Sequence, residues 1–420
     1  MKISSQDHAG QVFSIDYWVR IVLLAALAFP GGIYSASAQQ CSFTSPSDGS
    51  DGDYDLSNTP AGTVVYFNAS NFKGTGVANN VFNFGKITIP AGVTVKFTES
   101  VFHGSVYWLA TGDVTIAGSL DLTGENGVAA GTDPTTRHPA VAGSGGYPGG
   151  VGGGGPLAFI ATPGGGPGGG AIGNPTQATD GFAGTFTGSN DYLVPLIGGS
   201  GGGGGYYSAS ATSFGYGGGG GGGAIMIASS TAVNIAGNGN INAYAGAGVC
   251  SAHGSGGSIF LEANTISIAT TEALYAWYRS GCGQSGSPGV IRLEACSIVS
   301  SVGTPTLPVA LTSTPTKVFL PSAPVPQLRV TSINGTTITE NPFTFPDIQI
   351  NTASSVPVVI TAHQVPVGTI PTLYILSETG DQQLQCTGGL QGTLATSTCT
   401  INIAFNFGGS RGFVRATWAQ

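Results

Sequence analysis

The sequence has few charged residues and, after residue 40, no strong helical periodicity. Asp, Glu, Lys and Arg together make up only 8% of the 420 residues, about one third of the share that is usual in globular proteins. Low charge combined with 71 glycines argues against a cytosolic enzyme or a helical bundle and favours an extracellular β protein. The formal net charge of −8 disfavours nucleic acid and anionic membrane as partners.

Metal-binding motifs are also missing. The chain has no Cys-x-x-Cys pair and no Cys/His cluster, which argues against a zinc site. The exception is an acidic patch, whose oxygens are candidate calcium ligands although the closing bidentate Glu is absent. The patch consists of Asp48, Asp51, Asp53 and Asp55. Calcium is therefore the one cofactor that the sequence suggests, and the competing interpretation is a solvated surface segment.

A segment near the N-terminus has the pattern of a targeting signal. Arg20 precedes the apolar residues 21–29, and the small residues Ala36 and Ala38 follow. This pattern predicts a secretory signal over residues 1–38, cleaved after Ala38. The run is too short for a permanent membrane-spanning helix, although an N-terminal anchor is the alternative. We expect the mature chain to be secreted or held at the cell surface.

All six cysteines follow this segment, and an even number in an exported chain predicts disulfides. Cys386 and Cys399 lie at the ends of an expected hairpin and are predicted to pair. Cys250 and Cys282 occupy equivalent points of a sequence repeat, so they form the second predicted pair. Cys41 and Cys296 are the two cysteines that remain, so they are assigned to a third pair by elimination only.

A recurring phrase of short strands is the strongest structural signal. Its copies begin at residues 107, 224, 258 and 290, and each alternates apolar and polar residues. Period-two patterning within a repeat of this length predicts a parallel solenoid, and the crossover rule predicts a right-handed one. Residues expected to form continuous interior rows are Ile225, Ile227, Val233, Ile235 and Ile241, then Ile259, Leu261, Ile266, Ile268 and Leu274, then Ile291 and Leu293.

The repeat is interrupted by a glycine-rich insertion over residues 125–223. One interpretation is a mobile low-complexity loop, because glycine loses the most backbone entropy on ordering. The other is an ordered packing of extended polyglycine segments, with scattered aromatic residues holding parts of the insertion against the solenoid. The sequence leaves both open.

The remaining boundaries follow from composition. Residues 39–299 form the predicted β-helix domain, and the Pro/Thr/Ser-rich residues 300–327 are predicted to be an extended linker. Residues 328–420 contain short alternating runs separated by turn signals, which predict an Ig-like β-sandwich. The runs expected to be strands are 328–333, 356–362, 372–376, 398–405 and 412–418. The fold class is therefore all-β.

Catalytic candidates are few. Glu262 and Glu294 follow the first strand of successive repeats, so they are expected to stack one repeat apart, with Arg292 nearby. Paired carboxylates can serve as acid and base in glycan cleavage. The simpler interpretation, which we favour at this point, is two solvated surface carboxylates.

Several strings carry a resemblance: residues 47–52, 87–95, 109–118 and 217–228. They resemble glycine-rich secreted β-helix proteins of soil bacteria, which are loosely grouped with surface adhesins and pectate-lyase-like solenoids. The resemblance implies export and a cell-surface or matrix role, and it brings no catalytic motif.

We therefore expect an exported structural or adhesive protein that is not an enzyme, whose partner is a glycan, a protein or a second copy of itself. The alternative is a carbohydrate-binding or carbohydrate-cleaving β-helix. Carboxylates and aromatics on one outer face, including Glu262, Glu294 and Trp277, would favour this alternative.

Overall fold

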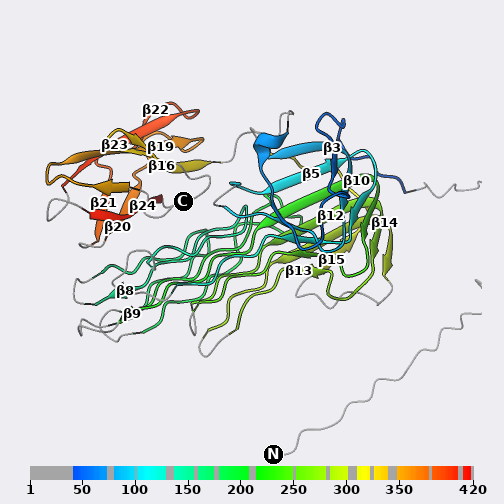
Figure 1. The fold of residues 1–420 in the computed structure, drawn as a ribbon, viewed down its shortest axis with the longest axis horizontal. Coiled ribbons are helices and arrows are strands. Elements are labelled where there is room, and N and C mark those ends of the chain that lie inside the picture. The colour runs from blue at the N-terminus through cyan, green and yellow to red at the C-terminus, as the bar shows by residue number, and fades with distance from the viewer. Residues whose placement is uncertain are drawn as a thin grey trace, which may run out of the picture. The chain divides into compact units, whose positions relative to one another are not determined.

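The computed structural model describes residues 41–72, 80–99, 102–128, 137–155, 159–174, 179–207, 214–248, 252–280, 284–300, 310–321, 326–338, 348–377, 381–404 and 410–417. In these residues the protein is all-β, with parallel sheets, antiparallel sheets and almost no helix (Figure 1). Helix within this part of the chain is limited to one 3-10 turn, η2 (Ala69–Asn71). None of the described helical segments has the length and hydrophobicity of a membrane span.

The first sheet is parallel, and its strands follow the order β1-β3-β5-β10-β12-β14-β15, with β6 pairing beside β3 and β10. It has the most strands of the parallel sheets. The bounds of its strands are β1 (Gly52–Asp55), β3 (Val81–Ile89), β5 (Val106–Ala110), β6 (Val114–Ile116), β10 (Ala224–Ile235), β12 (Ser258–Ile268), β14 (Val290–Ser300) and β15 (Ala310–Ser313).

The second sheet is also parallel and has the order β13-β11-β7-β4-β2. From β1 to β13 the chain alternates between the two sheets, adding to the first sheet and then one strand to the second, whereas β14 and β15 add to the first sheet alone. The strands of the second sheet are β2 (Val64–Tyr66), β4 (Thr94–Lys96), β7 (Ser119–Asp121), β11 (Asn240–Asn242) and β13 (Leu274–Tyr275).

The predicted interior rows are confirmed. Ile225 pairs in register with Ile259, and Ile259 pairs with Ile291 in the next pass. In the second sheet Ile241 pairs with Leu274. All of the residues that the repeat placed inside belong to one buried core, which continues into an aromatic cluster around Phe67 and Trp108. Each pass therefore shares its buried apolar face with the neighbouring passes, as the repeat requires.

The described residues of the glycine-rich insertion form an ordered bundle of extended segments, here called the glycine bundle (Figure 1). In its central run, residues 217–223, successive backbone N–H groups donate in turn to three neighbouring segments. Gly217, Gly220 and Gly223 donate to the carbonyls of Val128, Glu125 and Leu122, respectively. Gly218 and Gly221 donate to those of Gly150 and Tyr147. Gly219 and Gly222 donate to those of Ala252 and Ser255.

Donors to the same neighbour are thus three residues apart, which is the period of an extended threefold helix. The run also accepts hydrogen bonds from segments on its other sides, for example from Gly202 to Gly219 and from Gly246 to Gly220. The segments lie so close that side chains do not fit between them. A Cβ atom on Gly201 would lie 1.9 Å from the carbonyl oxygen of Pro148. Close backbone packing explains the glycine content of the described insertion.

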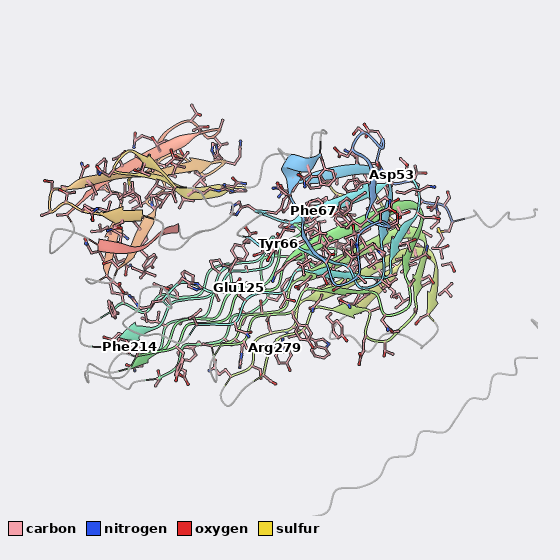
Figure 2. The ribbon with its side chains drawn as sticks, in the orientation of Figure 1. Asp53, Tyr66, Phe67, Glu125, Phe214 and Arg279 are labelled. Atoms are coloured by element: carbon pink, nitrogen blue, oxygen red, sulfur yellow. A yellow bond between two sulfur atoms is a disulfide. The ribbon has the colours of Figure 1, made fainter. Side chains whose placement is uncertain are left out.

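Aromatic side chains also pack within the bundle. Phe159, which is buried, packs against Phe214 with ring centroids 6.2 Å apart, close to the short pair β8 (Gly153–Gly154) and β9 (Tyr206–Tyr207). Figure 2 shows Phe214 near this end of the bundle and Glu125 closer to the parallel sheets. The ordered alternative therefore holds for the described residues, with aromatic contacts as an addition to the backbone hydrogen bonds.

The C-terminal residues form two antiparallel sheets around their own core, which includes Val358, Ile360 and Leu373. Strands lie within a few residues of all five predicted runs. The first sheet contains β16 (Gln327–Ile333), β17 (Thr336–Thr337), β19 (Val356–His363), β22 (Gln391–Gly392) and β23 (Ser397–Ile403), and the second contains β18 (Ile348–Ile350), β20 (Thr372–Ser377), β21 (Gln382–Gln385) and β24 (Ser410–Thr417).

One segment differs from its expected role. Residues 310–313 lie in the stretch assigned to the extended linker, but they form β15 and pair with β14. Shortly after, Val318 is 8% exposed and joins a second apolar cluster on the outer face of the first sheet. The parallel part of the protein therefore extends beyond residue 299, because a proline-rich segment can still add an edge strand where its N–H groups are free to pair.

Candidate functional site

Glu262 and Glu294 lie side by side on the first sheet. They are register partners on β12 and β14, and their neighbours Leu261 and Leu293 point into the core between the sheets. Because side chains alternate along a strand, both glutamates project from the opposite, outer face. The predicted stacking of these two residues is therefore observed.

The expectation that they are solvated is wrong. Glu262 is 0% exposed and Glu294 is 1% exposed. Three separate parts of the chain cover this outer face and bring apolar side chains onto it, namely Phe43, Leu193 with Leu196, and Val318. The repeat pattern contains no information about this cover, since the covering segments belong to no copy of the repeat. We call residues 313–318 the C-terminal strap and residues 41–47 the N-terminal strap.

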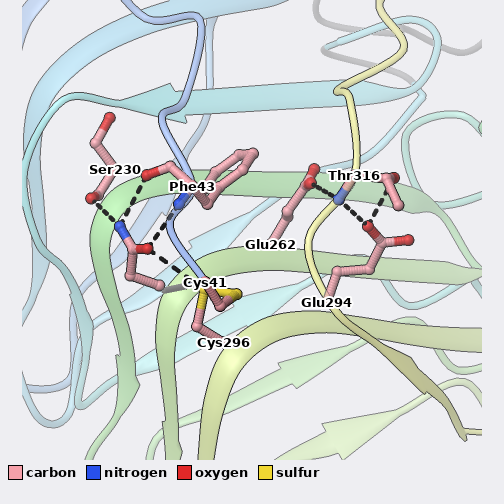
Figure 3. The surroundings of a disulfide bond; sticks show 8 residues. Cys41, Phe43, Ser230, Glu262, Glu294, Cys296 and Thr316 are labelled. Atoms are coloured by element: carbon pink, nitrogen blue, oxygen red, sulfur yellow. Dashed lines mark hydrogen bonds between the residues drawn. A yellow bond between two sulfur atoms is a disulfide. The ribbon is translucent and has the colours of Figure 1, made fainter. Parts of the chain in front are cut away.

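Thr316 of the C-terminal strap joins the two glutamates (Figure 3). Its backbone N–H donates to Oε1 of Glu262 at 3.0 Å and to Oε2 of Glu294 at 2.8 Å. Its hydroxyl also donates to Oε2 of Glu294, at 2.8 Å. The strap is thus held to the sheet by hydrogen bonds to carboxyl groups, which are stronger than those between neutral groups when the acceptor is ionised.

Arg292 supplies the positive charge of the site. Its Nε donates to Oε1 of Glu294 at 2.6 Å, and its other nitrogens donate to the carbonyl of Asp191 and the hydroxyl of Ser313. The guanidinium carbon lies 4.7 Å from the ring centroid of Tyr192. The arginine therefore neutralises Glu294 and leaves Glu262 without a cationic partner of its own among the described residues.

Because Arg292 pairs with Glu294 alone, the two carboxyl groups have different electrostatic surroundings. Burial, reinforced by the negative charge of Glu294, raises the pKa of Glu262 to about 8. Its Oε2 atom is buried and has no hydrogen-bond partner among the described residues, an arrangement that disfavours the ionised form. A neutral carboxylic acid beside a carboxylate is a combination that glycan-cleaving enzymes use, but here neither group reaches solvent.

We expect the stability of the protein to fall as the pH rises from about 5 to about 8. Glu262 holds its proton up to a higher pH in the folded chain than in the unfolded chain, where the pKa is near 4.5. The stabilisation is therefore complete below the unfolded value and is lost as pH approaches the folded value, by up to about 1.4 kcal/mol per pH unit. Urea unfolding across this range measures the slope.

Glu262→Gln should flatten this dependence, since an amide can accept from Thr316 without titrating. Glu272→Gln is the matched control, because Glu272 is exposed and its removal should leave the slope unchanged. A wild-type slope that persists in Glu262→Gln would contradict the assignment of the proton to Glu262.

The N-terminal strap is anchored by residues that the sequence analysis did not single out (Figure 3). Asn264 accepts from the backbone N–H of Phe43 at 2.7 Å and donates to the carbonyls of Phe43 at 2.8 Å and Ser230 at 2.6 Å. Ser230 in turn accepts from the N–H of Ser45 at 3.0 Å. Ser230 and Asn264 are polar residues at similar positions of successive passes, and this was the signal that the sequence offered. The sequence did not indicate that the N-terminal strap would cross them.

The Cys41–Cys296 disulfide closes the N-terminal strap beside these contacts. This pair and Cys386–Cys399 are two of the three pairs that the sequence predicted. Cys250 and Cys282 lie outside the described residues, as does the predicted cleavage site at Ala38. The two straps border a groove of about 300 Å³, lined by Ser42, Phe43, Thr44, Pro46, Pro315, Thr316, Lys317 and Val318.

The calcium candidates do not converge. Each carboxylate accepts a hydrogen bond from a different backbone N–H: Asp48 from Ser50, Asp51 from Asn83, Asp53 from Lys86 and Asp55 from Ser57. The hydrogen bonds from Ser50 and Ser57 lower the pKa of Asp48 and of Asp55. In the part of the chain that the structure covers, no three His, Cys, Asp or Glu residues are placed to hold a metal ion. The acidic residues instead order the first pass.

Trp277 does not share a face with the glutamates. It follows β13 of the second sheet and packs against Tyr278, with ring centroids 5.9 Å apart, whereas Glu262 and Glu294 belong to the first sheet. The single surface of aromatics and carboxylates that would have favoured a carbohydrate-cleaving β-helix is not formed by these residues.

Comparisons with known proteins identify no relative. No family model matches this chain, and neither a curated protein nor a solved structure matches it.

Proposed function

We propose that this chain is an exported, non-catalytic structural or adhesive protein that acts at the cell surface or in the extracellular matrix. The observation that carries the proposal is the glycine bundle. Its central run has backbone partners on every side and buries almost no side-chain functional groups. Such a bundle is a rigid support, and it offers little of the side-chain chemistry that a catalytic site needs.

The closed state of the carboxylate pair supports the same conclusion. Glu262 and Glu294 lie beneath the C-terminal strap, where both accept hydrogen bonds from Thr316 and Glu294 also accepts one from Arg292. A general acid must come within hydrogen-bond reach of its substrate. The pair is therefore better explained as two buried hydrogen-bond acceptors that hold the C-terminal strap against the sheet than as an active site.

For the architecture we propose a short right-handed parallel β-helix that carries the glycine bundle, followed by an Ig-like β-sandwich. Alternation of the chain between two parallel sheets supports the first part, since parallel crossovers are right-handed in nearly all proteins. Two antiparallel sheets around one core support the second. Disulfide-bonded cysteines support an oxidising compartment outside the cytosol.

The test is an assay of the mature chain, residues 39–420, with a panel of polysaccharides and extracellular matrix proteins. We expect retention on at least one of these surfaces, or self-association of the protein, without shortening of any glycan. Product analysis by size separation distinguishes the alternatives. Glycan shortening that disappears in Glu262→Gln and Glu294→Gln, but persists in Glu272→Gln, would show a carbohydrate-cleaving enzyme and refute the proposal.

A further inference from the structure

The outer face of the second sheet differs from that of the first sheet, because it is polar. In this sheet Val65, Val95, Leu120, Ile241 and Leu274 are in register, and their side chains pack on the core. The residues between them therefore point outward. We call six of these outward residues the polar face: Thr94, Lys96, Ser119, Asp121, Asn240 and Asn242.

Two tyrosines border the polar face. Tyr66 of β2 pairs in register with Lys96, and Tyr275 of β13 pairs with Asn242. Tyr66 is 51% exposed, and Tyr275 stacks on Tyr244 with ring centroids 5.4 Å apart. At a strand spacing of about 4.8 Å, the two tyrosines mark the ends of a row about 19 Å long.

Two of the polar side chains, Asp121 and Asn242, are held in place and still have free hydrogen-bonding capacity. One oxygen of Asp121 accepts from the N–H of Thr123, and the amide oxygen of Asn242 accepts from the N–H of Tyr244, both at 3.0 Å. Among the described residues, the second Asp121 oxygen and the Asn242 amide nitrogen have no partner. Fixed polar groups of this kind lose little entropy when they bind a ligand.

A groove of about 490 Å³ runs along the start of these strands and crosses three passes. Its lining includes Thr94, Ser119 and Asn240 of the polar face, together with Asn238. Gly118 also lines the groove, and a Cβ atom there would lie 2.2 Å from the carbonyl oxygen of Val93. Backbone packing therefore keeps this part of the groove free of side chains.

The chemistry of this surface fits a chain of neutral sugars. Hydroxyl and amide groups can exchange hydrogen bonds with sugar hydroxyls, and the tyrosines present amphipathic rings. Lys96 and Asp121 are adjacent in register, so the six residues of the polar face carry no net charge, which favours a neutral polymer over a charged one. A protein partner would more typically meet an apolar centre, which the six residues of the polar face do not provide.

We infer that the polar face, from Tyr66 to Tyr275, binds a neutral polysaccharide that lies across the passes of the chain. This inference deepens the proposed adhesive function and rests on it. The bound glycan would contact Asn242 and Asp121 in the middle of the row, Thr94, Ser119 and Asn240 along the groove, and a tyrosine at either end.

The experiment compares wild-type protein and variants on immobilised cellulose, chitin, xylan and mannan. We expect wild type to bind at least one of them, and the double variant Asp121→Ala with Asn242→Ala to bind at least tenfold more weakly. Tyr66→Ala is a second, independent variant at an exposed position, with an expected loss of a few fold. Asn402→Ala, an exposed change on β23 of the C-terminal sheets, is the matched control and should bind as wild type.

Unchanged binding by the double variant and by Tyr66→Ala would overturn this inference while leaving an adhesive function in place. Absence of binding to all four glycans would also overturn it, and matrix-protein binding or self-association would then still support the proposed function. Shortening of the bound glycan would instead refute the proposed non-catalytic function. Thermal unfolding and the oligomeric state of each variant show whether lost binding reflects lost folding or a lost contact between copies.

Discussion

Replacing Gly221 with alanine is expected to lower the free energy of unfolding by about 3 kcal/mol or more, the cost of severe overpacking. The added Cβ atom would lie 1.9 Å from the carbonyl oxygen of Gly199. This neighbour is backbone, so no side-chain rotation can relieve the contact. The N–H of Gly221 donates to Tyr147 and its carbonyl accepts from Gly143, so a shift of the run would break hydrogen bonds on other sides.

Gly205→Ala is the matched control, because the same change occurs in a neighbouring glycine run. Its nearest atom to the added Cβ is 3.3 Å away, and we expect a loss of about 1 kcal/mol or less. Chemical denaturation of both variants, followed by circular dichroism, measures the difference. Equal stability of the two variants would contradict the close packing of the bundle and would favour the mobile-loop interpretation of the insertion.

Removal of the Cys41–Cys296 disulfide is the second large effect that we expect. The two cysteines are 255 residues apart in sequence, and closing a loop of this length lowers the entropy of the unfolded chain. The chain-entropy model gives a loss of about 5.5 kcal/mol when the bond is absent. The N-terminal strap should also detach more easily, since only its contacts with residues such as Asn264 and Ser230 would then hold it.

The double variant Cys41→Ser with Cys296→Ser tests this expectation by urea unfolding under oxidising conditions. The comparison is Cys386→Ser with Cys399→Ser, whose loop spans 13 residues and for which the same model gives about 3 kcal/mol. The first change should destabilise the parallel sheets and the second only the antiparallel sheets. A smaller loss for the long loop than for the short one would show that native contacts of the N-terminal strap, and not chain entropy, determine its stability.

The repeat phrase alone determined the parallel pairing and the interior rows of the passes that contain it. Alternation in each copy shows which side chains face inward, and equal spacing between copies places Ile225, Ile259 and Ile291 beside one another. The same argument placed Glu262 beside Glu294. Five strands of the antiparallel sheets were also predictable, because alternating runs between turn signals depend on local sequence.

Only the tertiary structure decided whether the glycine-rich insertion is ordered. Glycine has no side chain that would indicate a neighbour, and its backbone entropy favours disorder unless many hydrogen bonds form together. For residues 217–223 those bonds come from segments as distant in sequence as residues 122–128 and 252–255. No local pattern identifies such partners.

The burial of the carboxylate pair was decided in the same way. Glu262 and Glu294 have the sequence pattern of solvated residues, since they alternate with core leucines on a strand. Arg292 belongs to the repeat, but Thr316 and the apolar side chains that cover the pair come from segments outside it. The sequence therefore determined which face of each strand is inside, whereas contacts between distant segments determined which outer face meets solvent.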